Sequence, residues 1–291
     1  MTRRTLTFRK LQDRLAGACS QLAVLLAVAI MLWILASVCR RGLPAISATF
    51  LTEPSKPFGL PDNGIANALL GTLLITGGAA LIAIPTALLG GIFLAEFHDW
   101  PRLTAAIRFA ANVMMGMPSV IVGLFVYLVI VVPTGHFSGL AGSVALALIM
   151  LPVIMRTTED MLLMVPNALR EAALALGMTR ARTTLHIVCK SARAGLLTGI
   201  LLAISRVSGE TAPLLFTALY ADAWPTTYAS APTPNLPVLI TEYATNSPFE
   251  SMHQAGWGAA LIAMTLILAI NIASRFLCRR KGQAAWADAF P

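Results

Sequence analysis

Long uninterrupted apolar runs are the feature that most constrains the fold of this chain. Several runs reach the ~20 residues that a helix needs to cross a hydrocarbon core of ~30 Å. Hydrophobic residues make up 57% of the sequence and charged residues only 12%, against roughly 25% charged in a typical soluble domain. The runs do not alternate in polarity, which excludes a β-barrel. The sequence therefore predicts an all-α, polytopic membrane protein.

The charged segments between these runs predict a topology. We expect six transmembrane helices, at 19–39, 64–95, 110–132, 139–155, 194–219 and 255–275. Five Lys or Arg residues lie in the N-terminal tail, two in 96–109, six in 156–193 and four from Arg275 onward, whereas the opposite side holds three. The positive-inside rule places both termini and 156–193 in the cytoplasm, although Arg40 and Arg41 run against it.

This topology divides the chain into four parts. They are a cytoplasmic tail at 1–18, the first helix with a periplasmic loop at 19–63, a core at 64–275 and a cytoplasmic tail at 276–291. The basic start followed by an apolar run also resembles a signal peptide. A retained anchor is favoured, because the run is too long for a signal h-region and no small-residue cleavage site follows it.

Motifs for metal binding, nucleotide binding and hydrolysis are missing from the sequence. The four cysteines and four histidines are dispersed, with no metal-ligand spacing. None of the lysines follows a glycine, so a P-loop is excluded, and neither HExxH nor GxSxG occurs. The net charge of +8 gathers on one side of the membrane, which does not favour nucleic acid. We expect no catalytic residue, metal or cofactor, and a separate partner as the source of any energy.

Arg206 and Glu210 are charged residues within the fifth apolar run. Their spacing of four puts them on one face of a continuous helix, where they can pair. An arginine at mid-membrane costs ~2.5–3.5 kcal/mol on the insertion scale, so it should face protein or a water-filled path. One interpretation is a structural ion pair. The other is a cationic contact for an anionic solute, because the arginine fork suits phosphate or carboxylate.

Arg156 follows the fourth run and is a second candidate cation. An arginine at a helix end commonly extends to the lipid headgroups, so a place on a solute path is only one of its two interpretations.

The segment 156–193 is predicted to fold as two helices joined at a glycine. Pro166 and Asn167 are typical of a helix start, and Gly177 is typical of a helix end. An amphipathic helix lying on the membrane is one interpretation. A docking element for a soluble partner is the other.

The sequence Glu171-Ala172-Ala173, with Gly177 and Ile187 at their spacing, resembles the EAA loop of ABC importer permeases. The resemblance implies that Arg170, Glu171, Ala172, Ala173, Gly177 and Ile187 belong to a coupling helix that fits a cleft in an ATPase subunit. The family pattern closes Ile-x-Leu-Pro, whereas this chain has Ile187-Val188-Cys189-Lys190.

Three further stretches, 117–125, 151–166 and 206–216, resemble the PstA-type permeases of phosphate importers. The resemblance spans about 58–275 and implies a type I (MetI-like) importer fold in a bacterial inner membrane. It also implies a homologous PstC-type second permease, two PstB-type ATPase subunits and a periplasmic PstS-type phosphate-binding protein, with Arg206, Glu210 and Arg156 on the phosphate route. A permease for sulfate or molybdate is the first alternative. An ATPase-independent channel or scaffold is the second, and an intramembrane hydrolase is a distant third.

Overall fold

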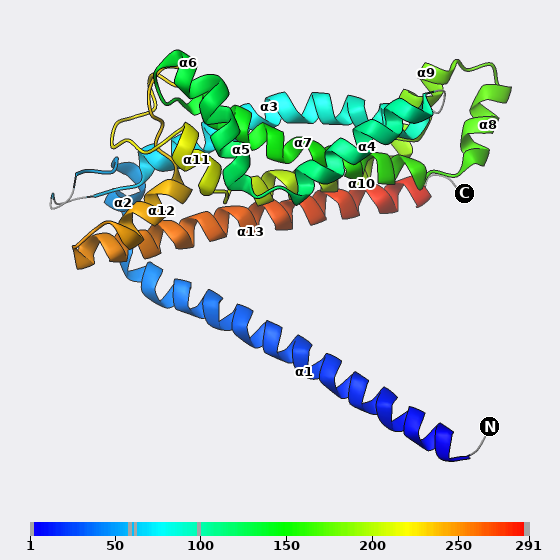
Figure 1. Cartoon of the computed structure of the whole chain (residues 1–291), viewed down its shortest axis with the longest axis horizontal. Coiled ribbons are helices and arrows are strands. Elements are labelled where there is room, and N and C mark those ends of the chain that lie inside the picture. Colours follow the sequence, from blue (N-terminus) through cyan, green and yellow to red (C-terminus); the bar gives the residue numbers. More distant parts are fainter. Residues whose placement is uncertain (1–2, 58–59, 61–62, 98–99, 288–291) are drawn as a thin grey trace.

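The computed structural model describes residues 3–57, 60, 63–97 and 100–287, and within these residues the chain forms helices and loops without a strand (Figure 1). The long helices are α1 (Arg3–Gly42), α3 (Ala66–Glu96), α4 (Pro101–Gly116), α7 (Gly139–Leu163), α10 (Cys189–Val207) and α13 (Glu250–Ala287). The shorter ones are η1 (Leu43–Ala45), α2 (Ala48–Thr52), α5 (Ser119–Val126), η2 (Tyr127–Val131), α6 (Val132–Thr134), α8 (Asn167–Ala175), α9 (Arg180–Arg182), η3 (Thr183–Val188), α11 (Ala212–Thr217) and α12 (Leu236–Thr245).

The centre of the molecule is the packing of α3 against α7, the most extensive helix pair of the fold. Ala79, Ala83 and Ala87 recur every four residues on α3 and are fully buried. Farther along the same helix, a Cβ at Gly91 would lie 2.5 Å from the Thr158 Cβ. Small side chains let two membrane helices approach backbone to backbone, and this is what joins α3 to α7.

Helix α10 packs on α7 through a glycine pair. Side-chain atoms of Met161 and Thr157 occupy the space that a Cβ at Gly195 or at Gly199 would need. The two glycines are four residues apart, so they lie on one face of α10. A larger residue at Gly199 would push α10 away from α7, whereas at Gly195 the flexible Met161 side chain would have to move.

The predicted span 110–132 is wrong as a single helix. Helices α4 and α5 meet at a bend of 104° between Gly116 and Ser119. Pro118 has no N–H to donate, and Met117 before it is extended (ψ 137°), as a residue preceding proline tends to be. The helix also begins at Pro101, in the stretch predicted as a cytoplasmic loop. Counting this bent pair as one span gives up to six membrane-crossing helices, in agreement with the predicted number.

The predicted span 194–219 is interrupted as well. Helix α10 ends at Val207, and α11 begins at Ala212 with Pro213 in its first turn. Helix α5 crosses this region closely, since a Cβ at Gly123 would lie 2.6 Å from the Pro213 Cα. The break in one span is therefore packed directly against the bent span.

Helix α1 stands apart from the bundle. Its apolar segment has no buried residue among those described, and its main contact with the body is with α13, where the Arg41 guanidinium lies 5.0 Å from the Trp257 ring centroid. Figure 1 shows the start of α1, the end of α13 and the α8–α9 region at one end of the long axis. This agrees with the prediction that the termini and 156–193 share one side.

The opposite end, which we call the cap, is closed by α2, α12 and the loop 218–235 (Figure 1). Asn67 at the start of α3 is fully buried there. Its Oδ1 accepts from the Ser55 N–H at 2.9 Å, and its Nδ2 donates to the Ser55 Oγ at 2.8 Å and the Asp222 carbonyl at 3.1 Å. One amide thus joins three segments of the cap.

Replacing Asn67 with Leu should destabilise the protein by about 1–3 kcal/mol, because the Ser55 N–H would be buried without an acceptor. Thermal unfolding in detergent should show an apparent midpoint lower by several degrees. Asn246→Leu is the matched control, because Asn246 follows α12, is exposed, and donates to the Glu242 side chain of that helix at 2.7 Å. Equal midpoints for the two variants would contradict the role given to Asn67.

Candidate functional site

Arg206 lies one residue before the end of α10, and its side chain is exposed. Helix α10 ends at Val207 and residues 208–211 lie outside any helix, so the four-residue spacing no longer brings Glu210 onto the same face. Within the described part of the chain, no ion pair joins Arg206 to Glu210. The predicted pairing is therefore wrong, and its cause is the helix break that Gly209 and Pro213 introduce.

The position of Arg206 along the bundle constrains what can cover the exposed face of α10 that carries it. Gly195 packs against Met161 and Gly199 against Thr157, so α10 runs antiparallel to α7 and Arg206 lies about level with the middle of α7. Arginine facing lipid at this depth costs ~2.5–3.5 kcal/mol even on the insertion scale. This face of the isolated chain is consequently one that protein or water, and not lipid, has to cover.

A cavity of about 540 Å³ lies between the break at 208–211, α12 and α13. Its lining is mostly apolar, and the polar side chains are the hydroxyls of Ser208, Thr211 and Thr241 and the amide of Asn271. No lysine or arginine is among the described residues that line it. The described residues of the cavity therefore offer an anion no cationic partner.

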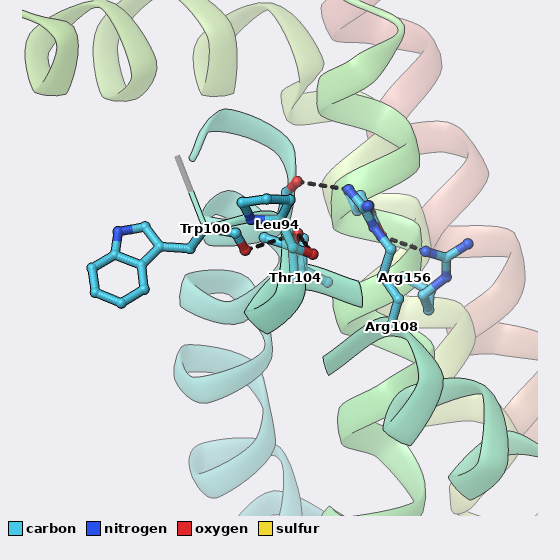
Figure 2. Close-up of polar contacts among 7 residues, drawn as sticks. Leu94, Trp100, Thr104, Arg108 and Arg156 are labelled. Atoms are coloured by element: carbon cyan, nitrogen blue, oxygen red, sulfur yellow. Dashed lines mark hydrogen bonds and ion pairs between the residues drawn. The ribbon is translucent and has the colours of Figure 1, made fainter. Parts of the chain in front are cut away.

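A cluster of three charges lies toward the α8 end of the core. Glu159 is 2% exposed and accepts from two arginines, the Arg156 Nη1 at 2.5 Å and the Arg108 Nε at 2.6 Å. Arg108 comes from α4 and also donates through Nη2 to the Leu94 carbonyl of α3 at 3.1 Å (Figure 2). The cluster therefore ties α3, α4 and α7 together, and two guanidinium groups on one carboxylate leave a net charge of +1.

Arg156 was predicted at the end of the fourth span, but α7 continues to Leu163, so Arg156 lies about two turns inside the helix. Sequence reasoning missed Arg108 and Glu159. The spacing of Arg156 and Glu159 was a usable signal, since side chains three apart share a helix face. Pro101 was a second signal, because proline favours the first turn of a helix and would have placed Arg108 inside one.

Helix α8 has the boundaries that the sequence predicted. It begins after Pro166 and ends before Gly177, whose φ is +82°. The Gly177 N–H donates to the Leu174 carbonyl at 2.9 Å and the Met178 N–H to the Ala173 carbonyl at 3.1 Å. These two bonds form a Schellman motif, which places its left-handed residue where glycine is least strained.

The six residues predicted for ATPase coupling do not all face the same way. Glu171, Ala172 and Gly177 are exposed, Ala173 is buried, and Ile187 is half-buried. Arg170 points inward to Glu96 of α3 at 2.9 Å. After this region the helix continues without a break, because η3 runs straight into α10. The EAA pattern would have a proline there, at the position of Lys190. Of the predicted coupling residues on α8, Glu171 and Ala172 thus belong to its exposed surface, together with Leu169 and Leu174.

Comparison with known proteins identifies the family. Residues 87–283 match the family described as binding-protein-dependent transport system inner membrane component. The chain belongs to this family. It is 40% identical over 274 residues to the phosphate transport system permease protein PstA of Haemophilus influenzae, with 94% of this chain and 96% of the relative covered. It is 38% identical over 275 residues to a probable PstA of Methanocaldococcus jannaschii, with coverage of 93% and 95%.

Solved structures agree on the fold. The inward-facing MetNI methionine ABC transporter superposes with a TM-score of 0.62 at 18% identity, covering 74% of this chain and 95% of that one. An amino acid ABC transporter solved with histidines gives 0.55 at 17% identity, with 74% and 92% covered. The chain therefore has the MetI-type permease fold that the sequence predicted, and it is a multi-pass integral membrane protein whose relatives are transport subunits.

Proposed function

We propose that this chain is the transmembrane permease subunit of an ATP-driven importer of inorganic phosphate. The observation that carries the proposal is the identity of 40% to a PstA permease over nearly the full length of both chains. On this proposal a PstC-type permease completes the translocation path, two PstB-type ATPases supply the energy, and a periplasmic PstS-type protein delivers phosphate. The membrane would be the bacterial inner membrane, with the α8 end in the cytoplasm.

The arrangement of charges supports a path for an anion. Arg206 is exposed on a face that lipid does not suit, and a second permease packed there would enclose it beside water. Arginine can donate two parallel hydrogen bonds to phosphate, and a weak contact favours passage over trapping. The cluster of Arg108, Arg156 and Glu159 carries a net positive charge and lies farther toward the α8 end. A phosphate that has passed Arg206 would reach this cluster next. Glu159, and not Glu210, is then the carboxylate that limits how strongly a cationic site holds the anion.

The function is tested by reconstituting the four kinds of subunit in proteoliposomes. With binding protein and labelled phosphate on one side and ATP on the other, uptake should need ATP and this chain together. Unlabelled sulfate or molybdate at a hundredfold excess should leave uptake unchanged. Strong competition by either anion would favour a permease for another oxyanion. Uptake without ATP or ATPase would favour a channel.

The exposed surface of α8 is where we expect the ATPase to dock. Glu171 has no ion pair in the described part of the chain, so Glu171→Arg should change stability by no more than about 0.5 kcal/mol. It should nevertheless greatly reduce the ATPase that co-purifies, because a charge is reversed in the contact. Glu250→Arg at the cap end is the control and should leave association intact. Normal association of the Glu171 variant would count against α8 as the docking site.

A further inference from the structure

Arg170 was predicted as a contact for the ATPase, but its side chain is turned into the molecule. Its side chain is 17% exposed and that of its partner Glu96 is 15% exposed. Glu96 is the last residue of α3, 74 positions earlier in the chain. The orientation of Arg170 therefore separates it from Glu171 and Ala172, which point to the outside.

All five N–H groups of the guanidinium are engaged. Nε and Nη2 donate to the Glu96 Oε1 at 3.2 and 2.9 Å, and Nη2 donates also to the Leu162 carbonyl at 2.8 Å. Nη1 donates to the Val165 carbonyl at 2.5 Å and to the Asn167 Oδ1 at 3.2 Å. A guanidinium has five donors in a fixed plane, so none is left for a partner protein while these bonds hold.

The acceptors belong to separate elements of the fold. Glu96 ends α3, Leu162 lies in the last turn of α7, and Val165 lies in the linker to α8. An apolar cluster of Ala95, Leu162, Val165, Val188 and Ala192 lies at the same junction. Polar and apolar contacts thus hold the root of α8 against the ends of two core helices.

We propose that Arg170 is a positioning residue that makes α8 move as one body with the ends of α3 and α7. A partner that displaces α8 would then displace these helices, one of which carries the Arg156–Glu159 pair. Without the five bonds, α8 could tilt on the Pro166 linker while the core stays in place. The inference rests on the proposed coupling to an ATPase.

The test compares Arg170→Ala, Arg170→Lys and Glu96→Gln with the control Arg102→Ala. Arg102 is an exposed arginine near the same end for which the structure shows no ion pair among the described residues. The readouts are the ATPase that co-purifies with the full complex and the phosphate imported per ATP hydrolysed. Arg170→Ala should keep the ATPase but lower the phosphate-to-ATP ratio about tenfold. Lysine, with donors on a single nitrogen, should restore only part of the ratio.

Glu96→Gln keeps the ATPase contact surface untouched because Glu96 lies on α3, and it should lower the ratio in the same direction. An unchanged ratio in Arg170→Ala, or in Glu96→Gln if the alanine variant fails to assemble, overturns the proposal. Loss of the ATPase from Arg170→Lys with a normal Glu96→Gln complex also overturns it, in favour of a direct contact.

Hydrogen exchange on the purified chain gives a readout that does not depend on phosphate. Amides of α8 and of 162–165 should exchange faster in Arg170→Ala than in the wild type and the Arg102→Ala control, and equal exchange overturns the proposal. A wild-type complex that imports no phosphate would contradict the proposed function alone, since the exchange experiment still tests the role of Arg170.

Discussion

Arg206→Ala should reduce ATP-driven phosphate uptake by about tenfold to a hundredfold. A hydrogen bond to a charged group contributes about 1.5–3 kcal/mol, and each 1.4 kcal/mol corresponds to a factor of ten. Arg206 makes no ion pair in the described structure, so removing it leaves no buried carboxylate unpaired. The loss should therefore appear in transport and not in stability.

Arg206→Lys is the informative second variant. Lysine keeps the positive charge but lacks the planar fork, so uptake should fall between that of the wild type and the alanine variant. Arg40→Ala serves as the control, because Arg40 is an exposed arginine at the end of α1. Wild-type uptake by Arg206→Ala, in complexes with a full complement of ATPase, would remove Arg206 from the path.

Glu159→Ala should strongly destabilise the protein. It removes the carboxylate to which both Arg108 and Arg156 donate and leaves two like charges facing each other. Breaking a buried ion pair costs about 3–5 kcal/mol, and the partial exposure of the arginines (38% and 29%) lowers the expected cost to about 2–3 kcal/mol. Glu159→Gln should cost less, because the amide oxygen still accepts one hydrogen bond.

Denaturant titration in mixed micelles measures this cost, with Asp160→Ala as the neighbouring control. Asp160 is exposed and forms no ion pair among the residues that the structure describes. The double variant Glu159→Ala with Arg108→Ala should lose less stability than the two single costs together, since the second change removes an unpaired charge. Strictly additive costs would show that the 2.6 Å contact contributes little.

The parts of the site that depend on neighbours in the sequence were predictable. Helix α8 begins after Pro166 and ends before Gly177, as expected. A proline at a helix start and a left-handed glycine at a helix end each determine the backbone conformation of only a few neighbouring residues. The run from Ser208 to Pro213 also contains a glycine and a proline, which weaken a helix. What failed was the use of helical spacing across that run, which gave the pairing of Arg206 with Glu210.

The contacts that join distant segments were out of reach of a single sequence. Arg108 and Glu159 are 51 residues apart, and Glu96 and Arg170 are 74 apart. Charge alone placed Arg108 in a loop, because the positive-inside rule counts arginines without regard to helix starts. The carboxylate with which an arginine pairs depends on how α3, α4 and α7 pack. The small residues that determine this packing do not indicate which charged side chains it brings together.

The bend between α4 and α5 has a consequence for how the chain is made. Each half is too short to cross the bilayer alone, and the bend interrupts the run of helical hydrogen bonds, which lipid cannot complete. The contacts that hold the halves, Arg108 with Glu159 and Gly123 with Pro213, come from segments translated later. Helix α1 needs no such neighbours. During synthesis we therefore expect α1 to enter the bilayer at once, and residues 101–134 to stay beside the insertion machinery until residue 213 has emerged from the ribosome.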